Sequence, residues 1–391
     1  MLNLIKLAVQ MQGLSQHLTQ EASANHRRLE LAQEYFRRAC DYQGELIQKQ
    51  QQWQKNILFA NATPVEPLNT CINISTPPKI HTIIATDGSQ IAPSHHEIAY
   101  CYLLNIGRVI LHYCQNKHPI LDSLPEIFYR QEDLYISRQW GIKTEEWMSY
   151  HRTKSEILTL VELATSIEKE IPTLAMVDGS LIYWFLEQLS SDARQYILPP
   201  ILKAWRQMQD AQIPVMGYIS ASRSIEGMNF LRLVACPHPS PDCMSFCPNH
   251  KEKLPCQVFE SLRDTSLWIN QLQPGQRGPL WRSNTRILDL YEDQQIYFCY
   301  VHVGAEIARV EVPEWVIKEE NLFDTSLRLM LSQVYKGYGY PIAIAEAHNQ
   351  AVVSGRDKTH FFAFLEQQMI KAGLKNVGIS YKEARKRGGI A

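Results

Sequence analysis

The chain has 391 residues, with 39 Lys and Arg side chains against 40 Asp and Glu side chains, so its formal net charge is −1. This balance excludes a broad basic field, and binding of a nucleic acid would therefore depend on a local groove or on metal ions. Nine cysteines, an odd number, argue against a complete disulfide framework. We find no apolar run of the roughly 18 residues that a membrane span needs, and no signal peptide, so we expect a cytoplasmic protein.

The first part of the chain predicts helices. Residues 2–57 carry apolar side chains at three- and four-residue spacings, and we expect a helical hairpin that turns at residues 23–25. The apolar stripe of this hairpin predicts either an internal packing face or a dimer contact. Four prolines lie between residues 60 and 79. We therefore assign residues 1–58 to an N-terminal helical region and residues 59–79 to a linker.

The following part of the chain predicts a mixed sheet flanked by helices. The predicted elements are strands at residues 80–87, 97–104 and 109–114, a helix at 153–169, a strand at 174–178, a helix at 181–212 and a strand at 214–219. A hairpin turn at residues 105–107 joins the second and third strands, and residues 115–150 predict a loop with a short helix. The order of elements is that of an RNase H-like domain, so we expect an α/β fold. We assign residues 80–375 to this domain and residues 376–391 to a basic tail.

Two of the predicted strands end in the same triplet, Asp-Gly-Ser, at residues 87–89 and 178–180. A carboxylate at the end of a buried strand is disfavoured in its charged form unless a cation or a hydrogen-bond donor compensates it. Two such carboxylates on two strands can be compensated together by one or two hard divalent cations. Alternatively, each aspartate caps the turn that follows it. The repetition of strand and triplet favours a metal site at Asp87 and Asp178.

A glutamate of the helix before the second triplet is a third candidate ligand. A helix that returns beside a strand of about six residues must cover about 20 Å, so it starts roughly 20 to 23 positions before Asp178 when a short loop is added. Glu156 lies 22 positions before Asp178 (178 minus 156), whereas Glu162 lies only 16 positions before it and on a different helix face. We choose Glu156 and keep Glu162 as the alternative.

Five short segments together resemble the NurA family of nucleases, which process DNA ends with a HerA-type hexameric ATPase. The segments are the two Asp-Gly-Ser strands, the Ser-rich residues 220–224, the Arg-Val-Glu-Val-Pro run at 309–313, and the residues Gly-Tyr-Gly-Tyr-Pro at 337–341 followed by Ala-Glu-Ala-His at 345–348. The resemblance covers about residues 80–370. It implies an RNase H-like fold, exonuclease and endonuclease activity that depends on Mn²⁺ or Mg²⁺, and a homodimer around a DNA channel.

The resemblance also implies the site residues. Its metal-binding carboxylates are Asp87, Glu156 and Asp178, and it places Tyr340 and His348 beside the metals. His348 either binds a metal or transfers a proton, because an imidazole exchanges protons near neutral pH. Tyr340 either contacts the phosphate or a base, or is a core tyrosine.

A further residue of these segments is a candidate for DNA contact. Arg309 either contacts the DNA backbone or forms an ion pair with Glu311 or another neighbour.

Residues 236–256 form a second cluster of metal-ligating types: Cys236, His238, Cys243, Cys247, His250 and Cys256. Such a set could bind Zn²⁺ or, alternatively, an iron–sulfur cluster. The spacing of the cysteines matches no standard knuckle, and the alternative is a loop of free thiols that pack as small apolar groups. A bound metal would be structural, with Cys236, Cys243, Cys247 and Cys256 as its candidate ligands.

The sequence therefore predicts a metal-dependent DNA nuclease that acts in DNA end resection and repair. Two alternatives remain at this stage. One is a catalytically silent subunit that docks on the hexameric ATPase, and the other is an RNase H-like enzyme that acts on RNA or on a hybrid. Discrimination between RNA and DNA requires contacts to the 2′-hydroxyl, and no motif reveals such contacts.

Overall fold

The computed structural model describes residues 3–93, 99–168, 170–247, 254–259 and 261–373. It divides the chain into two compact units, each of which consists of two separate segments. The first unit contains Met1–Ser75 and Tyr218–Glu314, and the second contains Thr76–Gly217 and Trp315–Ala391. This division differs from the predicted boundaries, which place residues 80–375 in one domain. The predicted basic tail, residues 376–391, lies outside the described residues.

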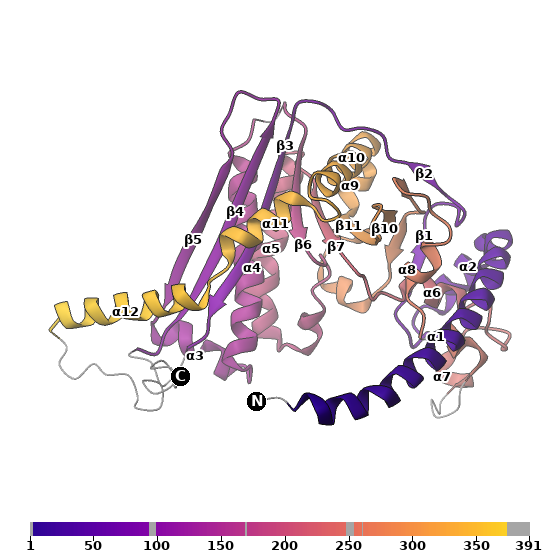
Figure 1. Cartoon of the computed structure of the whole chain (residues 1–391). Coiled ribbons are helices and arrows are strands. Elements are labelled where there is room, and N and C mark those ends of the chain that lie inside the picture. The colour runs from indigo at the N-terminus through magenta and orange to yellow at the C-terminus, as the bar shows by residue number, and fades with distance from the viewer. Residues whose placement is uncertain (1–2, 94–98, 169, 248–253, 260, 374–391) are drawn as a thin grey trace. The chain divides into compact units, whose positions relative to one another are not determined.

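The second unit contains a mixed sheet with the strand order β7-β6-β3-β4-β5 (Figure 1). Its strands are β3 (His81–Ile91), β4 (Tyr102–Tyr113), β5 (Ile120–Phe128), β6 (Thr173–Asp178) and β7 (Val215–Ile219), along which the chain passes into the first unit. Strand β4 is antiparallel to both β3 and β5, whereas β6 is parallel to β3. The predicted α/β class, with a mixed sheet flanked by helices, is confirmed.

Helices cover both faces of this sheet. In Figure 1, α11 (Ile342–Ala351) crosses in front of β3 and β4, and α4 (Thr144–Thr165) lies behind them. Helix α5 (Ser191–Asp210) packs beside α4. The other helices of this part of the chain are α3 (Gln131–Gln139), the 3-10 helix η1 (Trp184–Gln188), α9 (Glu314–Lys318), α10 (Glu320–Lys336) and α12 (Gly355–Lys371).

Helix α11 lies unusually close to β4 because Gly107 has no side chain. A Cβ atom at Gly107 would lie 2.2 Å from the carbonyl oxygen of Ala347 and 2.6 Å from the amide nitrogen of Ala351. The carbonyl of Ala351 also accepts hydrogen bonds from Ser89 Oγ (2.5 Å) and Asn105 Nδ2 (2.8 Å). The end of α11 is therefore fixed to both β3 and β4 by polar contacts as well as by close packing.

The predicted strand boundaries need three corrections. Strand β3 does not end at Asp87 but continues to Ile91, so Gly88 lies inside a strand. Residues 105–107 are not a hairpin turn, because β4 passes through them without a break. The third strand is β5, in a part of the chain that we predicted as loop. In the sequence, Gly88 and Gly107 both look like turn residues. A glycine that makes room for a neighbouring helix cannot be distinguished there from a glycine that turns the chain.

The first unit contains a smaller antiparallel arrangement in the order β1-β9-β10-β11. Its strands are β1 (Ala62–Pro64), β2 (Ile72–Asn73), β8 (Gln276–Arg277), β9 (Trp281–Ser283), β10 (Ile296–His302) and β11 (Ile307–Pro313). Strand β2 pairs with β8, which in turn pairs with β10. Residues 59–79, which we predicted as a linker, contain two of these short strands, one of them fully buried.

The predicted N-terminal hairpin is also wrong, although its helical content is confirmed. Helix α1 (Leu4–Asp41) continues through residues 23–25, where no glycine or proline interrupts it, and α2 (Gln43–Trp53) follows after one residue. The C-terminal half of α1 buries Ala32 and Phe36 in the core of the first unit. The remaining helices of this unit are α6 (Glu226–Leu231), α7 (Cys243–Phe246), α8 (Asp264–Trp268) and the 3-10 helices η2 (Pro255–Phe259) and η3 (Arg286–Leu290). No helix in the described ranges has the length and apolarity to cross a membrane.

We predict that Gly107→Ala lowers the free energy of unfolding by about 1–3 kcal/mol, because its new methyl group meets backbone atoms that cannot move independently of α11. Urea denaturation of the purified chain measures this change. Gly44→Ala in α2 is the matched control: a Cβ there meets no atom within 4 Å, so we expect a gain of about 0.5–1 kcal/mol. Equal stability of the wild type and Gly107→Ala would contradict the close packing of α11.

Candidate active site

Two of the three predicted carboxylates lie on neighbouring strands of the second unit. Asp87 is inside β3, and Asp178 is the last residue of β6. The parallel pairing of these strands sets Thr86 opposite Val177, so the two aspartates occupy the next position on each strand. Adjacent strands are about 4.8 Å apart, which makes Asp87 and Asp178 near neighbours.

Glu156 of α4 approaches the same place, because Gly88 leaves space for it. A Cβ atom at Gly88 would lie 2.6 Å from Glu156 Oε1 and 2.6 Å from Arg152 Cγ. Arg152 forms an ion pair with Glu156 (Nε to Oε1, 3.2 Å), and Thr86 Oγ1 donates a hydrogen bond to the backbone carbonyl of Glu156 (3.0 Å). The alternative candidate, Glu162, is exposed and lies about 1.7 turns further along α4. The structure therefore brings Glu156, and not Glu162, beside the two aspartates.

The three carboxylates interact electrostatically. Burial raises the pKa of Glu156 to about 8, Arg152 opposes this rise, and the neighbouring Asp87 and Asp178 add to it. Burial also raises the pKa of Asp178, where a hydrogen bond from Tyr340 acts in the opposite direction. In the absence of a cation, Glu156 therefore keeps its proton at neutral pH.

His348, which the family resemblance placed beside the metals, lies next to Asp87. Its Nδ1 is 2.7 Å from Asp87 Oδ2, and its side chain is 63% exposed, whereas that of Asp87 is 17% exposed. The other carboxylate oxygen, Oδ1, accepts a hydrogen bond from the amide of Gly88 (2.8 Å). The carboxylate of Asp87 thus contacts both the backbone of β3 and a solvent-exposed imidazole.

Tyr340 is held near Asp178 by a tight turn between α10 and α11. Tyr338 (φ 55°) and Gly339 (φ 119°) both have left-handed backbone conformations, which reverse the chain after α10. A Cβ atom at Gly337 would lie 1.9 Å from the carbonyl oxygen of Tyr340, so the turn requires glycine there. The half-buried Tyr340 hydrogen-bonds to Asp178, a contact that is neither of the two roles considered from the sequence.

The donor atoms of this site suit a hard divalent cation, since carboxylate oxygens are the ligands that such ions prefer. Within the described residues, however, no three His, Cys, Asp or Glu side chains are gathered closely enough to make a ready metal-binding group. The structure thus brings together the predicted side chains as an electrostatically coupled group and not as a preformed coordination shell.

Sequence reasoning missed one functional candidate, Arg152. This arginine lies one helical turn before Glu156 and is the cation that contacts it in the described structure. An arginine four positions from a glutamate on a predicted helix was the available signal, because such pairs face each other.

Arg309 does not have the role of a DNA contact that we considered, and this prediction is corrected. Its side chain is only 3% exposed and forms ion pairs with Glu226 and Glu311, each at 2.7 Å. Its guanidinium also donates to Ser224 Oγ (2.7 Å) and lies over the ring of Phe298. The alternative interpretation, an ion pair, is the one that the structure contains. The Arg-Val-Glu-Val-Pro run and the Ser-rich stretch therefore meet in the core of the first unit.

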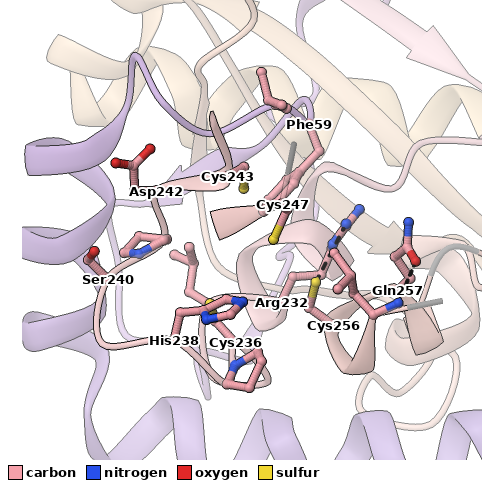
Figure 2. Close-up of a pocket in the computed structure, with 15 residues that line it drawn as sticks. Phe59, Arg232, Cys236, His238, Ser240, Asp242, Cys243, Cys247, Cys256 and Gln257 are labelled. Atoms are coloured by element: carbon pink, nitrogen blue, oxygen red, sulfur yellow. Dashed lines mark hydrogen bonds between the residues drawn. The ribbon is translucent and has the colours of Figure 1, made fainter. Parts of the chain in front are cut away.

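The four cysteines of the second cluster line one cavity of about 270 Å³ in the first unit (Figure 2). Burial raises the pKa of Cys236 and of Cys247. The other three thiols raise the pKa of Cys247 further. All four are free thiols. His238 also lines the cavity, whereas His250 lies outside the described residues.

Comparison with known proteins identifies the family of the chain. The model of the NurA domain matches residues 81–353. Among solved structures, the chain is similar to the NurA nuclease from Sulfolobus solfataricus, with 13% sequence identity, 88% of this chain and 98% of that chain covered, and a TM-score of 0.47. No match was found among curated proteins. The domain match confirms the resemblance seen in the sequence.

We predict that the pKa of Glu156 makes the metal-free protein less stable as the pH rises. The folded state keeps a proton up to about pH 8, whereas the unfolded state releases it near pH 4.3. The free energy of unfolding therefore falls by up to about 1.4 kcal/mol per pH unit between these values. Glu156→Gln should lose this slope in urea denaturation with EDTA, and Glu162→Gln should keep it. If the free energy of unfolding depends on pH in the same way for the wild type and for Glu156→Gln, the raised pKa of Glu156 is contradicted.

Proposed function

The chain belongs to the NurA family, and we propose that it is a DNA nuclease that depends on divalent metal ions and hydrolyses phosphodiester bonds at DNA ends. The observation that carries this proposal is the convergence of three coupled carboxylates, Asp87, Glu156 and Asp178, with Tyr340 and His348. All five residues lie within the matched range 81–353. Such a set is what phosphodiester hydrolysis needs, namely ligands for a cation and a group that moves a proton.

The donor set supports Mn²⁺ or Mg²⁺ as the ion. Asp87, Glu156 and Asp178 would hold it, with His348 as a further ligand or as a proton carrier. The chemistry that such an ion supplies is neutralisation of charge on the phosphate and activation of a water molecule. Glu156 must first release its proton, because only the carboxylate form is a ligand.

The other side chains have roles that follow from their contacts. When Nδ1 of His348 donates to Asp87, its Nε2 carries the lone pair and can accept a proton from a water molecule or return it to a leaving group. Tyr340 holds the carboxylate of Asp178 in orientation through its hydrogen bond. Arg152 favours the charged form of Glu156, and it can turn to the phosphate because its side chain is 33% exposed.

Family membership also supports the biological setting that we propose. It comprises DNA end resection and repair in the cytoplasm, an RNase H-like catalytic domain, a homodimer, and association with a HerA-type hexameric ATPase. The near-neutral net charge fits a protein that uses metal ions and a partner, and not a basic surface, to hold DNA. The family's DNA specificity favours this substrate over RNA.

We predict that the wild-type chain degrades end-labelled linear DNA with Mn²⁺ or Mg²⁺ and does not do so with EDTA. Asp87→Ala should reduce the rate at least about hundredfold, since it removes a carboxylate from the centre of the site. Gel electrophoresis of timed samples measures the rate. Glu162→Gln, on the exposed side of the same helix, should retain wild-type activity.

Two outcomes would redirect the proposal. If folded wild-type protein digests no DNA with any metal, the stand-alone nuclease is contradicted, and a docking subunit or an enzyme that requires its ATPase becomes the better model. If labelled RNA or an RNA–DNA hybrid is cut and DNA is not, the proposed DNA substrate is contradicted, whereas the proposed hydrolysis of phosphodiester bonds is supported.

We predict that the apparent affinity for Mn²⁺ rises about tenfold per pH unit between pH 6 and 8 and levels off above pH 8, because each bound ion displaces the proton of Glu156. Calorimetric titration in two buffers of different ionisation enthalpy measures both the affinity and the number of released protons. Glu156→Gln should bind more weakly and lose most of this pH dependence. A pH-independent affinity in the wild type would exclude Glu156 as a ligand that must be deprotonated.

A further inference from the structure

We propose that the cysteine-lined cavity of the first unit is a structural binding site for a zinc ion, with Cys236, Cys243, Cys247 and Cys256 as its ligands. The site is separate from the carboxylates of the second unit, and the proposal does not depend on nuclease activity. It rests on the donor set, on the cavity that these donors border, and on a buried arginine that contacts one of them.

The four thiols come from three short segments that the fold gathers in one place. Cys236 follows α6, Cys243 is the first residue of the single turn of α7, Cys247 follows that turn, and Cys256 lies in η2. The amide of Cys247 donates to the carbonyl of Cys243 (3.0 Å), so these two side chains lie on the same side of that turn. Four thiolates are a complete tetrahedral shell for zinc, and a shell without an open position is structural, not catalytic.

The cavity argues against thiols that serve only as small apolar packing groups. Such groups normally pack against one another with few voids larger than a water molecule. Here they border an open space of about 270 Å³, and Figure 2 shows all four sulfur atoms along its wall. Among mostly apolar neighbours, the four thiols and Arg232 border this space, so soft donors are available to a ligand there.

Arg232 supplies the compensating charge that such a site needs. Its guanidinium Nη2 lies 3.8 Å from Cys256 Sγ, and its residue is only 8% exposed. The guanidinium also lies 4.0 Å from the ring centre of Phe59, which holds it in the cavity wall (Figure 2). Zinc with four thiolates carries a charge of −2, and a buried N–H donor to a ligating sulfur stabilises that charge.

Binding would require the cavity to contract. In the described residues no three of the thiols are gathered closely enough to hold an ion. Helix α7 is only four residues long, and it is tied to the rest of the unit by Asp242, which accepts hydrogen bonds from Asn56 Nδ2 (2.8 Å) and from the amide of Ser245 (3.2 Å). A short turn of this kind can move toward Cys236 and Cys256 as the ion forms its bonds. The ion would then contribute to the stability of the first unit, because metal binding is coupled to local folding.

The test is a Co²⁺ titration of the full-length, reduced, metal-free protein, followed by Zn²⁺ competition. Cobalt bound to thiolates gives an intense sulfur-to-metal charge-transfer absorption, which cobalt at a carboxylate site does not give. We expect this absorption to saturate at one equivalent per chain and to disappear when Zn²⁺ is added. Cys243→Ser and Cys247→Ser should lose most of the intensity, and Cys71→Ser, a change at an exposed cysteine outside the cavity, should retain it.

The wild-type titration decides the question even if a cysteine variant does not fold. Absence of the charge-transfer absorption in reduced, folded wild-type protein would overturn the proposal. So would peptide mapping of protein prepared without reductant, if it finds a disulfide between two of the four cysteines with no bound metal. A chromophore of an iron–sulfur cluster in protein purified without oxygen would also overturn the assignment to zinc.

Discussion

The candidate site depends on the close approach of two helices to the sheet of the second unit, and this approach depends on two glycines. Gly88 in β3 leaves room for the side chains of Arg152 and Glu156 from α4. Gly107, which pairs with Asp87, leaves room for the backbone of α11. Successive residues of a strand face opposite sides, so Asp87 faces α11 while Gly88 faces α4. A side chain at either glycine would separate a helix from the strand that carries Asp87.

The second property of the site is the electrostatic cost of its carboxylates. Glu156 is kept near two aspartates in surroundings that favour its protonated form. An apolar or amide side chain at this position would avoid the cost of burying an ionisable group. The contacts of Arg152, Tyr340 and His348 each reduce this cost for one carboxylate. This arrangement is typical of a functional site, where a fold tolerates unfavourable local interactions because a ligand relieves them.

Much of the site could be predicted from the sequence, because its residues belong to short segments with strong local signals. The repeated Asp-Gly-Ser triplets led to Asp87 and Asp178. Helix geometry led to Glu156 and not to Glu162, although α4 begins at Thr144 and not at the start that this geometry predicted. The family resemblance added Tyr340 and His348. The boundaries of β3 and β4 were wrong, because a glycine that admits a helix and a glycine that turns the chain look alike in one sequence.

The features that could not be predicted depend on contacts between distant residues. Arg309 lies in a run that suggested DNA binding, and only the positions of Glu226 and Glu311 reveal that it is buried. The N-terminal helix carried no signal for its length, because an apolar stripe fits one long helix as well as two short ones. The two discontinuous units could not be predicted either, since the segments that join are separated by 142 residues in the first unit and by 97 in the second.

The discontinuity has a consequence for the chain as it leaves the ribosome. Asp87 and His348, which contact each other in the finished protein, are 261 positions apart. Helix α11, which carries the histidine, can reach β3 and β4 only after the whole of the first unit's second segment has been made. A nascent or prematurely terminated chain therefore exposes its aspartates without the imidazole and without the turn that holds Tyr340. If the proposed roles of Tyr340 and His348 hold, incomplete products of this nuclease lack two residues of its site.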